Sequence, residues 1–291
     1  MIIRLSVTSC SLTMWSLSRE NGEFAYSWGL LRYILMTCFW CRQLSVNQRL
    51  ALTLSLNEYV MFQIEPVAIL SSPYQEKFAI PRQPGLVPAA RGRLWLQGEY
   101  NNPHCVQGIE SFSHLWLQFV FHQTLAQGWR PMVRPPRLGG NKKIGVFATR
   151  STFRPNGLGL SVVKLESVGN ENKQWFIEIS GFDLLDQTPV VDIKPYLAYS
   201  DAVHQAESSY AQQPPAHMEV QFSPTAQRAL QNQQGLAALI AQVLAQDPRP
   251  AYQRASSSQA TPREYGVRLA DHNVKWQVEG NLAIVTAVTH C

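Results

Sequence analysis

The 291-residue sequence has few cysteines and no long apolar run. Its five cysteines are odd in number and scattered, which argues against a disulfide-stabilised secreted domain and for a reducing compartment. No stretch is apolar over the about 20 residues that a membrane-spanning helix needs. Ser, Thr and charged residues interrupt the N-terminal apolar run, so it does not resemble a secretory signal. We therefore expect a cytoplasmic protein without membrane contact.

Two motifs of nucleotide-binding folds are also missing. No G-x-G-x-x-G follows the first expected strand and no P-loop is present, which argues against a Rossmann fold and a P-loop NTPase. Cys38 and Cys41 form a C-x-x-C, but without a second ligand pair or a nearby His we interpret it as a chance pair and expect no metal site. The formal net charge of +5 permits a nucleic-acid partner without requiring one.

What the chain does contain is a series of short strand-like segments joined by Gly- and Pro-rich connections. Six or seven such strands without intervening helices predict a closed barrel or a sandwich rather than a doubly wound sheet. Residues 114–122 form a long apolar run that suits a central strand. The expected strands cover residues 64–70, 92–97, 114–122, 144–149, 160–168, 175–180 and 190–195.

The composition divides the chain into four parts. Residues 1–60 show no sustained period of 2 or 3.6, and we expect a poorly ordered extension or a start-site artefact. Residues 61–200 form the mainly β domain, and the Ala-, Gln-, Ser- and Pro-rich residues 201–222 form a linker. Residues 223–291 form a small α+β domain, with a helix over 226–246 that is capped by Ser223 and broken at Gly235. Its expected strands cover 265–269, 274–278 and 282–288.

A cluster of polar side chains follows the expected strand 144–149. Arg150, Ser151, Thr152 and Arg154 lie there, next to a Pro-Asn-Gly turn. Fixed guanidinium groups at the end of a strand suit a carboxylate or a phosphate. A solvated polar turn explains the same composition, and the residues alone leave both interpretations open.

Several blocks, taken together and in this order, resemble the TrmO family, also called TsaA or YaeB. The resemblance extends from about Met61 to about Val288 and leaves out the N-terminal extension. The blocks are Pro81-Arg82-Gln83-Pro84-Gly85, Phe112-Ser113-His114-Leu115-Trp116, Phe121-His122-Gln123, Arg134-Pro135-Pro136-Arg137, Gly145-Val146-Phe147-Ala148-Thr149-Arg150-Ser151, Arg154-Pro155-Asn156, Asp192-Ile193-Lys194-Pro195-Tyr196 and Asp247-Pro248-Arg249-Pro250-Ala251-Tyr252.

The resemblance implies a tRNA methyltransferase that uses S-adenosylmethionine. Its implied target is N6 of threonylcarbamoyladenosine at position 37, in the anticodon loop. The implied fold is a single-sheet β-barrel, and the implied assembly is a homodimer with cofactor sites near the subunit interface. Composition and strand spacing indicate only a mainly β body, a basic excess and no nucleotide-binding α/β motif.

The resemblance also assigns residues to the cofactor. Arg82 and Arg150 have the chemistry to bind the carboxylate of S-adenosylmethionine, and Asp183 could accept from its ammonium or a ribose hydroxyl. His122 has a structural interpretation as well, as a hydrogen-bonded His at the end of a strand. The expected cofactor-binding residues are Pro81, Arg82, Gln83, His122, Gln123, Arg150, Leu160, Ser180, Gly181, Phe182 and Asp183.

The methyl acceptor requires a proton acceptor and a site for its own carboxylate. Adenine N6 is a poor nucleophile, so a carboxylate or a carbonyl should take its proton, and the catalytic candidates are Asp186, Asp192 and Asp247. Arg154, Arg249 and Arg254 could bind the threonylcarbamoyl carboxylate, while Tyr252 or Phe153 could stack on the base. The block that begins at Asp247 could instead only dock the small domain on the barrel.

Three other functions remain open at this stage. A non-catalytic RNA-binding barrel explains the charge equally well, but it needs no cofactor. A methyltransferase of the same barrel type could act on another small acceptor. A sensing module could bind the cofactor without forming a methylated product.

Overall fold

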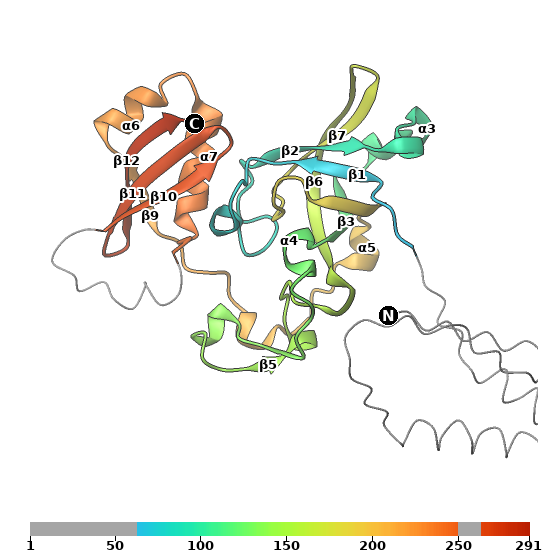
Figure 1. The fold of residues 1–291 in the computed structure, drawn as a ribbon, viewed down its shortest axis with the longest axis horizontal. Coiled ribbons are helices and arrows are strands. Elements are labelled where there is room, and N and C mark those ends of the chain that lie inside the picture. Colours follow the sequence, from blue (N-terminus) through green and yellow to red (C-terminus); the bar gives the residue numbers. More distant parts are fainter. Residues whose placement is uncertain (1–62, 250–262) are drawn as a thin grey trace, which may run out of the picture. The chain divides into compact units, whose positions relative to one another are not determined.

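The computed structural model describes residues 63–249 and 263–291 (Figure 1). The expected N-terminal extension, the Cys38–Cys41 pair, Tyr252 and Arg254 therefore lie outside the described residues. Residues 63–291 belong to one compact unit, which contains a barrel and a C-terminal module. Within the described ranges, no helix is long and apolar enough to cross a membrane.

The first part of this unit is a ring of six antiparallel strands. Around the ring the strands follow the order β1-β2-β7-β6-β3-β8, and β8 pairs with β1 to close the barrel. The mainly β body predicted from the sequence is confirmed. The strands are β1 (Ala68–Ser71), β2 (Arg91–Leu96), β3 (His114–Val120), β6 (Leu158–Glu171), β7 (Gln174–Ser180) and β8 (Pro189–Pro195).

Alternating side chains explain the closure of the barrel. Strand β3 buries Leu115, Leu117 and Phe119 and leaves the residues between them partly exposed, so every second side chain faces the interior. Strand β6 is 14 residues long and shifts register between Leu165 and Ser167. Its first half pairs with β3 and its second half with β7, so this one strand joins two sides of the barrel.

Because neighbouring strands are antiparallel, the connections gather at two ends of the barrel. The loop end carries residues 72–90 between β1 and β2, residues 121–157 between β3 and β6, and residues 181–188 between β7 and β8. The hairpin end carries residues 97–113 and the two-residue turn Asn172-Lys173 between β6 and β7.

The connections contain short elements. The predicted strand over 144–149 is wrong beyond its first two residues, because Val146–Ala148 forms a 3-10 helix and only Ile144 and Gly145 pair with the two-residue β4. The short elements are α3 (Pro103–Val106), α4 (His122–Leu125), β4 (Met132–Val133), β5 (Ile144–Gly145) and α5 (Ala198–Asp201), with 3-10 helices η1 (Lys77–Ala79), η2 (Gly98–Tyr100), η3 (Ile109–Ser111), η4 (Pro136–Leu138), η5 (Val146–Ala148), η6 (Pro155–Gly157) and η7 (Ser209–Ala211).

The C-terminal module is a four-stranded sheet with two helices. Its strands follow the order β10-β11-β12-β9, and β9 joins β12 in parallel. Strand β9 lies in the segment predicted as a linker and was missed. Ser223 caps the first helix as predicted. The elements are β9 (Glu219–Phe222), α6 (Pro224–Ala229), α7 (Gln234–Ala245), β10 (Glu264–Leu269), β11 (His272–Glu279) and β12 (Leu282–His290).

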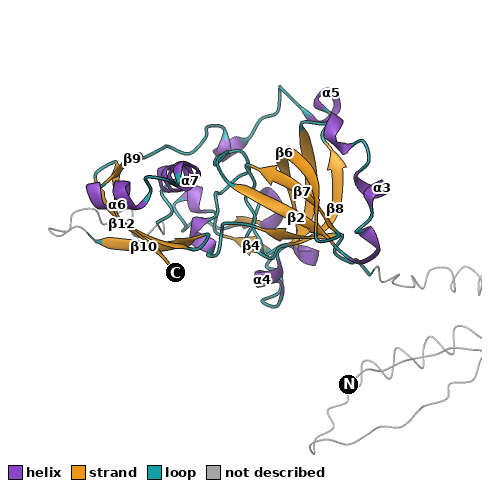
Figure 2. Ribbon diagram, turned by 90° about the horizontal axis from the view of Figure 1, so that it is seen from above, coloured by secondary structure: helices purple, strands orange, loops and turns teal. Residues whose placement is uncertain are grey.

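The helical segment of the module breaks earlier than predicted. Residues 230–233 separate α6 from α7, and Gly235 is the second residue of α7, where it does not interrupt the helix. Helix α7 lies on one face of the sheet (Figure 2). It buries Leu239, Ile240, Val243 and Leu244.

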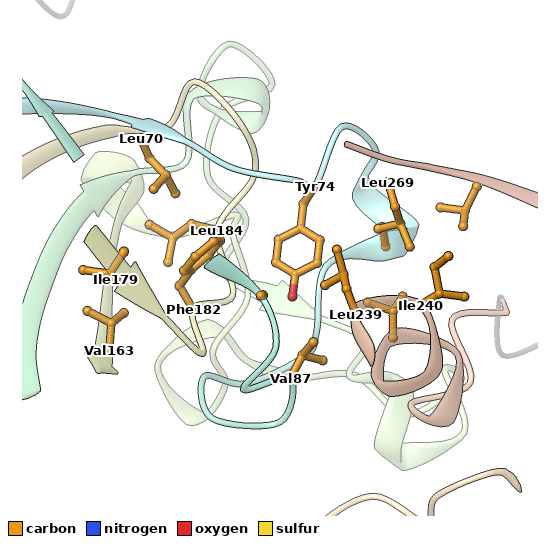
Figure 3. Close-up of a cluster of buried hydrophobic side chains, with 14 of the residues drawn as sticks. Leu70, Tyr74, Val87, Val163, Ile179, Phe182, Leu184, Leu239, Ile240 and Leu269 are labelled. Carbon is orange, nitrogen blue, oxygen red and sulfur yellow. The ribbon is translucent and has the colours of Figure 1, made fainter. Parts of the chain in front are cut away.

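Tyr74 connects the two hydrophobic cores. Its ring is fully buried, meets Phe182 of the barrel edge-on at 5.7 Å between ring centroids, and lies between Phe182 and Leu239 (Figure 3). Tyr74 also forms an isolated bridge with Leu269, and Ala270 N donates to Pro73 O at 2.8 Å. The module therefore docks at the loop end of the barrel.

Candidate active site

The loop end of the barrel collects nearly all the residues that the sequence assigns to the cofactor. Residues 72–90 carry Pro81, Arg82 and Gln83; residues 121–157 carry His122, Gln123 and Arg150; residues 181–188 carry Gly181, Phe182 and Asp183. Ser180 ends β7 and Leu160 is the third residue of β6, both at the same end. The strand topology thus brings together segments that are far apart in the sequence.

Hydrogen bonds join the three connections to one another. Arg150 Nη1 donates to Gln83 Oε1 at 2.5 Å, which links the connection 121–157 to the connection 72–90. Gly85 N donates to Gly181 O at 2.7 Å and Gly181 N donates to Ala90 O at 3.1 Å, which links residues 72–90 to residues 181–188. The loops are therefore held by each other as well as by their own turns.

Asp183 is placed by the stagger of the strands. Strand β7 ends at Ser180, which pairs with Lys164, so the first residues of β6 extend beyond the end of β7. In this extension Ser161 Oγ donates to Asp183 Oδ1 at 2.6 Å. Ser161 has no signature in the sequence, because an isolated serine in a strand ordinarily faces solvent. Its burial is a signal that only the structure provides.

The electrostatics of Asp183 suit a polar ligand. Burial raises the pKa of Asp183 to about 6, although the Ser161 hydroxyl, the backbone and the nearby Arg150 guanidinium each favour the carboxylate. Burial, and secondly the charge of Asp183, also raises the pKa of Tyr74 well above its ordinary value. A buried carboxylate that loses water on folding gains from a ligand that donates to it, such as an ammonium or a ribose hydroxyl.

His122 and Gln123 lie in α4, which is attached to a different part of the same connection. Phe121 N donates to Gly157 O at 2.8 Å, and Thr124 Oγ1 donates to Thr152 O at 3.5 Å. Arg154 belongs to this group, and its Nη1 donates to Thr149 O at 2.6 Å and to Val146 O at 3.3 Å. Arg154 also lines an open pocket of about 180 Å³ together with Trp129 and Leu125.

Some of the predicted cofactor residues use their side chains for packing. Phe182 is fully buried in the core and Pro81 is buried as well, so at the loop end they contribute shape and backbone groups. Ser180 Oγ donates to Glu166 Oε1 at 2.6 Å. Leu160, in contrast, is 52% exposed. Arg82 and Gln123 are exposed too, while His122 is partly exposed.

The three predicted proton acceptors are not clustered. Asp186 lies in the connection 181–188, accepts from Ser72 N at 2.8 Å, and lines a pocket of about 370 Å³ next to Arg91. Asp192 lies within β8 and pairs with Lys194 at 3.5 Å. Asp247 lies in the C-terminal module, directly after α7.

The predicted substrate residues that the structure describes are engaged with neighbouring groups. Arg249 donates Nε to Asp247 Oδ1 at 2.7 Å and Nη2 to Asp247 Oδ2 at 3.1 Å. This fork raises the pKa of Arg249 further above its usual value, and the Tyr265 side chain adds to the effect. Phe153 lies under the Arg130 guanidinium, 4.3 Å from its ring centroid.

The donor set at the loop end fits S-adenosylmethionine. Arg82 and Arg150 can bind its carboxylate, Asp183 can accept from its ammonium or ribose, and the amides of Gln83 and Gln123 suit an adenine edge. Within the described ranges no three His, Cys, Asp or Glu residues lie close enough to hold a metal ion. The arrangement can therefore bind and orient a charged organic donor.

Comparisons with known proteins agree with this geometry. Residues 69–202 match the family model for the tRNA-methyltransferase O N-terminal domain, and residues 215–291 match the TrmO C-terminal domain. The chain is 50% identical over 222 residues, covering 75% of this chain and 93% of the relative, to the tRNA (adenine(37)-N6)-methyltransferase of Escherichia coli K12. It is 44% identical over 140 residues to the Homo sapiens protein of the same name, of which the match covers 31%.

A solved structure provides a third comparison. The crystal structure of TrmO from Pseudomonas aeruginosa superposes with a TM-score of 0.65 at 42% identity, covering 80% of this chain and all of that chain. The two family models together span both the barrel and the C-terminal module, in the same order along the chain. The chain belongs to the TrmO family of tRNA methyltransferases.

Proposed function

We propose that this chain is an S-adenosylmethionine-dependent tRNA methyltransferase that methylates N6 of adenosine 37. The observation that carries the proposal is the agreement of both family models and a 50% identical relative of that name with the joined polar loops at one end of the barrel. Relatives from Pseudomonas aeruginosa and Methanothermobacter have descriptions that refer to S-adenosylmethionine, which supports the cofactor.

The residues of the loop end would bind and orient the cofactor. When bound, S-adenosylmethionine supplies an electrophilic methyl carbon on a sulfonium. Arg150, fixed by its bond to Gln83, holds a carboxylate in one direction. Asp183, fixed by Ser161, accepts a hydrogen bond from the ammonium or a ribose hydroxyl of the cofactor. The main task of such a site is to hold the methyl donor and the acceptor nitrogen in line. This positioning can lower the activation free energy of methyl transfer by about 7–11 kcal/mol.

The acceptor nitrogen must lose a proton during the reaction. Asp186 is our first candidate for the proton acceptor, because it lies in the same connection as Asp183, at the loop end. Asp192 and Asp247 remain candidates in β8 and in the C-terminal module. Substitution of each Asp by Asn, with single-turnover rates measured at saturating cofactor, separates them: the proton acceptor's variant loses rate while it retains cofactor affinity.

We further propose threonylcarbamoyladenosine as the methylated base. Its threonyl carboxylate requires a cation, and Arg154, Arg249 and Arg254 are the candidates, with Tyr252 or Phe153 stacking on the base. The test is mass spectrometry of tRNA nucleosides after incubation with cofactor, using tRNA with and without the threonylcarbamoyl group. Methylation of the unmodified base alone would contradict the substrate, and cofactor binding without any product would indicate a sensing module.

A homodimer is also proposed. Large apolar side chains remain exposed along the connection 121–157 and the adjacent start of β6, as is common where a second subunit packs. They are Leu125, Trp129, Met132, Phe147 and Leu160. Light scattering coupled to size-exclusion chromatography measures the mass directly, and a monomer at micromolar concentration would contradict the proposal.

A further inference from the structure

The loop 81–90 carries Arg82 and Gln83 and is held by several hydrogen bonds to the chain around it, among them Arg150 Nη1 to Gln83 Oε1 and Gly181 N to Ala90 O. At its middle, Gly85 N donates to Gly181 O at 2.7 Å, as described above. Near its end, Ala89 N donates to Gln242 Oε1 at 2.8 Å. The second bond joins residues 153 positions apart, because Gln242 lies in α7 of the C-terminal module. A residue of the module therefore fixes the backbone of a loop of the barrel.

Packing places Gln242 on the helix face that meets this loop. Leu239 and Ile240, on the same helix, are buried close to Val87 and Tyr74 (Figure 3). Val87 is fully buried, and Ala90 N donates to Val87 O at 3.1 Å. Residues 87–90 are thus packed against α7, and Gln242 supplies the acceptor for the Ala89 amide.

The first half of the loop carries the expected cofactor residues. Gln83 lies two residues before the anchor at Gly85, and its amide accepts from Arg150. Loss of the bond at Ala89 removes this hydrogen bond to the C-terminal module, while Gln83, Gly85 and Ala90 stay bonded to the barrel. A loop with fewer anchors samples more conformations, and a ligand that needs one of them then binds less tightly.

We propose that Gln242 is a positioning residue: by holding Ala89, it orders the loop 81–90, so that the C-terminal module sets the affinity of the barrel for its cofactor. This inference rests on the proposed function for the identity of the ligand. Gln242 acts through the loop and has no catalytic role.

The experiment uses the full chain with three substitutions. Gln242→Leu removes the acceptor and keeps the size of the side chain. Gln242→Glu keeps an acceptor oxygen at the same position and is the rescue variant. Ser223→Ala is the matched control, since it removes the cap of α6, where Ser223 Oγ accepts from Ala226 N, and destabilises the same module without touching the loop.

Two readouts are measured for each variant. Hydrogen exchange of the peptide that contains Ala89, in protein without cofactor, should accelerate about 10-fold in Gln242→Leu, because the amide loses its acceptor. The KM for S-adenosylmethionine should rise about 5- to 20-fold with kcat changed less than about 2-fold, because ordering the loop is a cost of binding. Gln242→Glu should restore both within about 2-fold, and Ser223→Ala should leave both unchanged.

Each possible outcome has a defined meaning. Unchanged exchange and KM in Gln242→Leu would overturn the inference, and so would an equal rise of KM in Ser223→Ala, which would reduce the effect to general stability. If the unaltered protein binds no S-adenosylmethionine, the proposed function fails, and exchange at Ala89 still reports whether Gln242 orders the loop.

Discussion

The two ends of the barrel are built by different physical means. At the hairpin end, Asn172 and Lys173 both adopt positive φ, the conformation of a tight two-residue turn between antiparallel strands. At the loop end, the connections are long and are held by bonds between distant residues, such as Gly85 to Gly181 and Arg150 to Gln83. The two-residue turn is thus encoded locally, whereas the arrangement of the loop-end connections depends on the whole fold.

Buried charge gives a second contrast. Glu171, at the hairpin end, forms an ion pair with Arg93 of β2 at 2.8 Å in which both side chains are about half exposed, and Arg93 also lies over the Phe176 ring. The loop end instead buries the Tyr74 hydroxyl and partly buries Asp183, whose pKa is raised by its loss of water. Buried polar groups cost free energy, so their concentration at one end indicates that this end is shaped by ligand binding rather than by stability alone.

The largest expected effect is at Arg150. We expect Arg150→Ala to lower the affinity for S-adenosylmethionine about 100-fold, which corresponds to ~2.7 kcal/mol, because a charge-assisted partner is lost and Gln83 is released. Titration calorimetry measures the affinity, and circular dichroism checks that the barrel is folded. Glu171→Ala, next to the two-residue turn, is the control from the hairpin end and should bind normally. Equal affinities in both variants would remove the contrast between the two ends.

The next effect concerns packing under the loop end. A Cβ at Gly92 would come within 2.6 Å of Ser71 O and 2.8 Å of Phe182 Cζ. We expect Gly92→Ala to reduce the free energy of unfolding by about 2–3 kcal/mol, because the neighbouring backbone and ring must move. Urea denaturation measures it. Gly145→Ala is the control, since nothing lies within 4 Å of its Cβ. If Gly92→Ala were as stable as the control, the Ser71 backbone and the Phe182 ring would be able to move aside at little cost.

Asp183 should separate stability from function. Its pKa is raised to about 6 in the folded protein, so the folded state binds the proton more tightly than the unfolded state. The favourable contribution is present below about pH 4 and is lost as the pH rises to about 6. Asp183→Asn should therefore stabilise the protein by about 1–2 kcal/mol at pH 7.5 but not at pH 4, while it weakens cofactor binding.

Thermal melts of Asp183→Asn and the unaltered protein across this pH range measure the difference. A constant difference in melting temperature from pH 4 to pH 8 would contradict a raised pKa. Loss of stability at pH 7.5 would instead indicate that the carboxylate itself holds the loop end together through Ser161.

The smallest effect is expected at the hairpin end. Glu171→Gln removes one charge of the exposed pair with Arg93 and should change the free energy of unfolding by less than about 0.5 kcal/mol, because solvent and salt screen such pairs. Activity should also be unchanged. A large effect of Glu171→Gln on kcat or KM would mean that the hairpin end takes part in substrate binding.

The sequence predicted the fold well where the pattern is local. Strands β2, β3, β7 and β10 were located to within two residues at most ends, because their alternation is set by their own side chains. Strand β9 was missed because Glu219–Phe222 is short and polar, and only its pairing with β12 makes it a strand. Residues 146–149 were wrongly predicted as a strand, because an apolar run does not reveal whether a neighbouring strand is available to pair with it.

The candidate site was predictable only through the family resemblance. The blocks around Arg82, Arg150 and Asp183 gave the residues, while the strand order that brings them to one end is a property of the closed sheet. Ser161 and Gln242 could not be selected, since a serine in a strand and a glutamine in an Ala-rich helix carry no chemical signature. Their roles come from bonds to Asp183 and Ala89.

The seam of the barrel has a consequence for synthesis on the ribosome. Strand β1 meets β8 through only two residue pairs, Ala68 with Val190 and Ile69 with Pro189, although these partners are far apart along the chain. The ring therefore stays open until translation has passed residue 190. In the C-terminal module, β9 likewise cannot pair until β12 has been synthesised. Nascent chains shorter than this expose unpaired strand edges, so we expect them to need protection from chaperones.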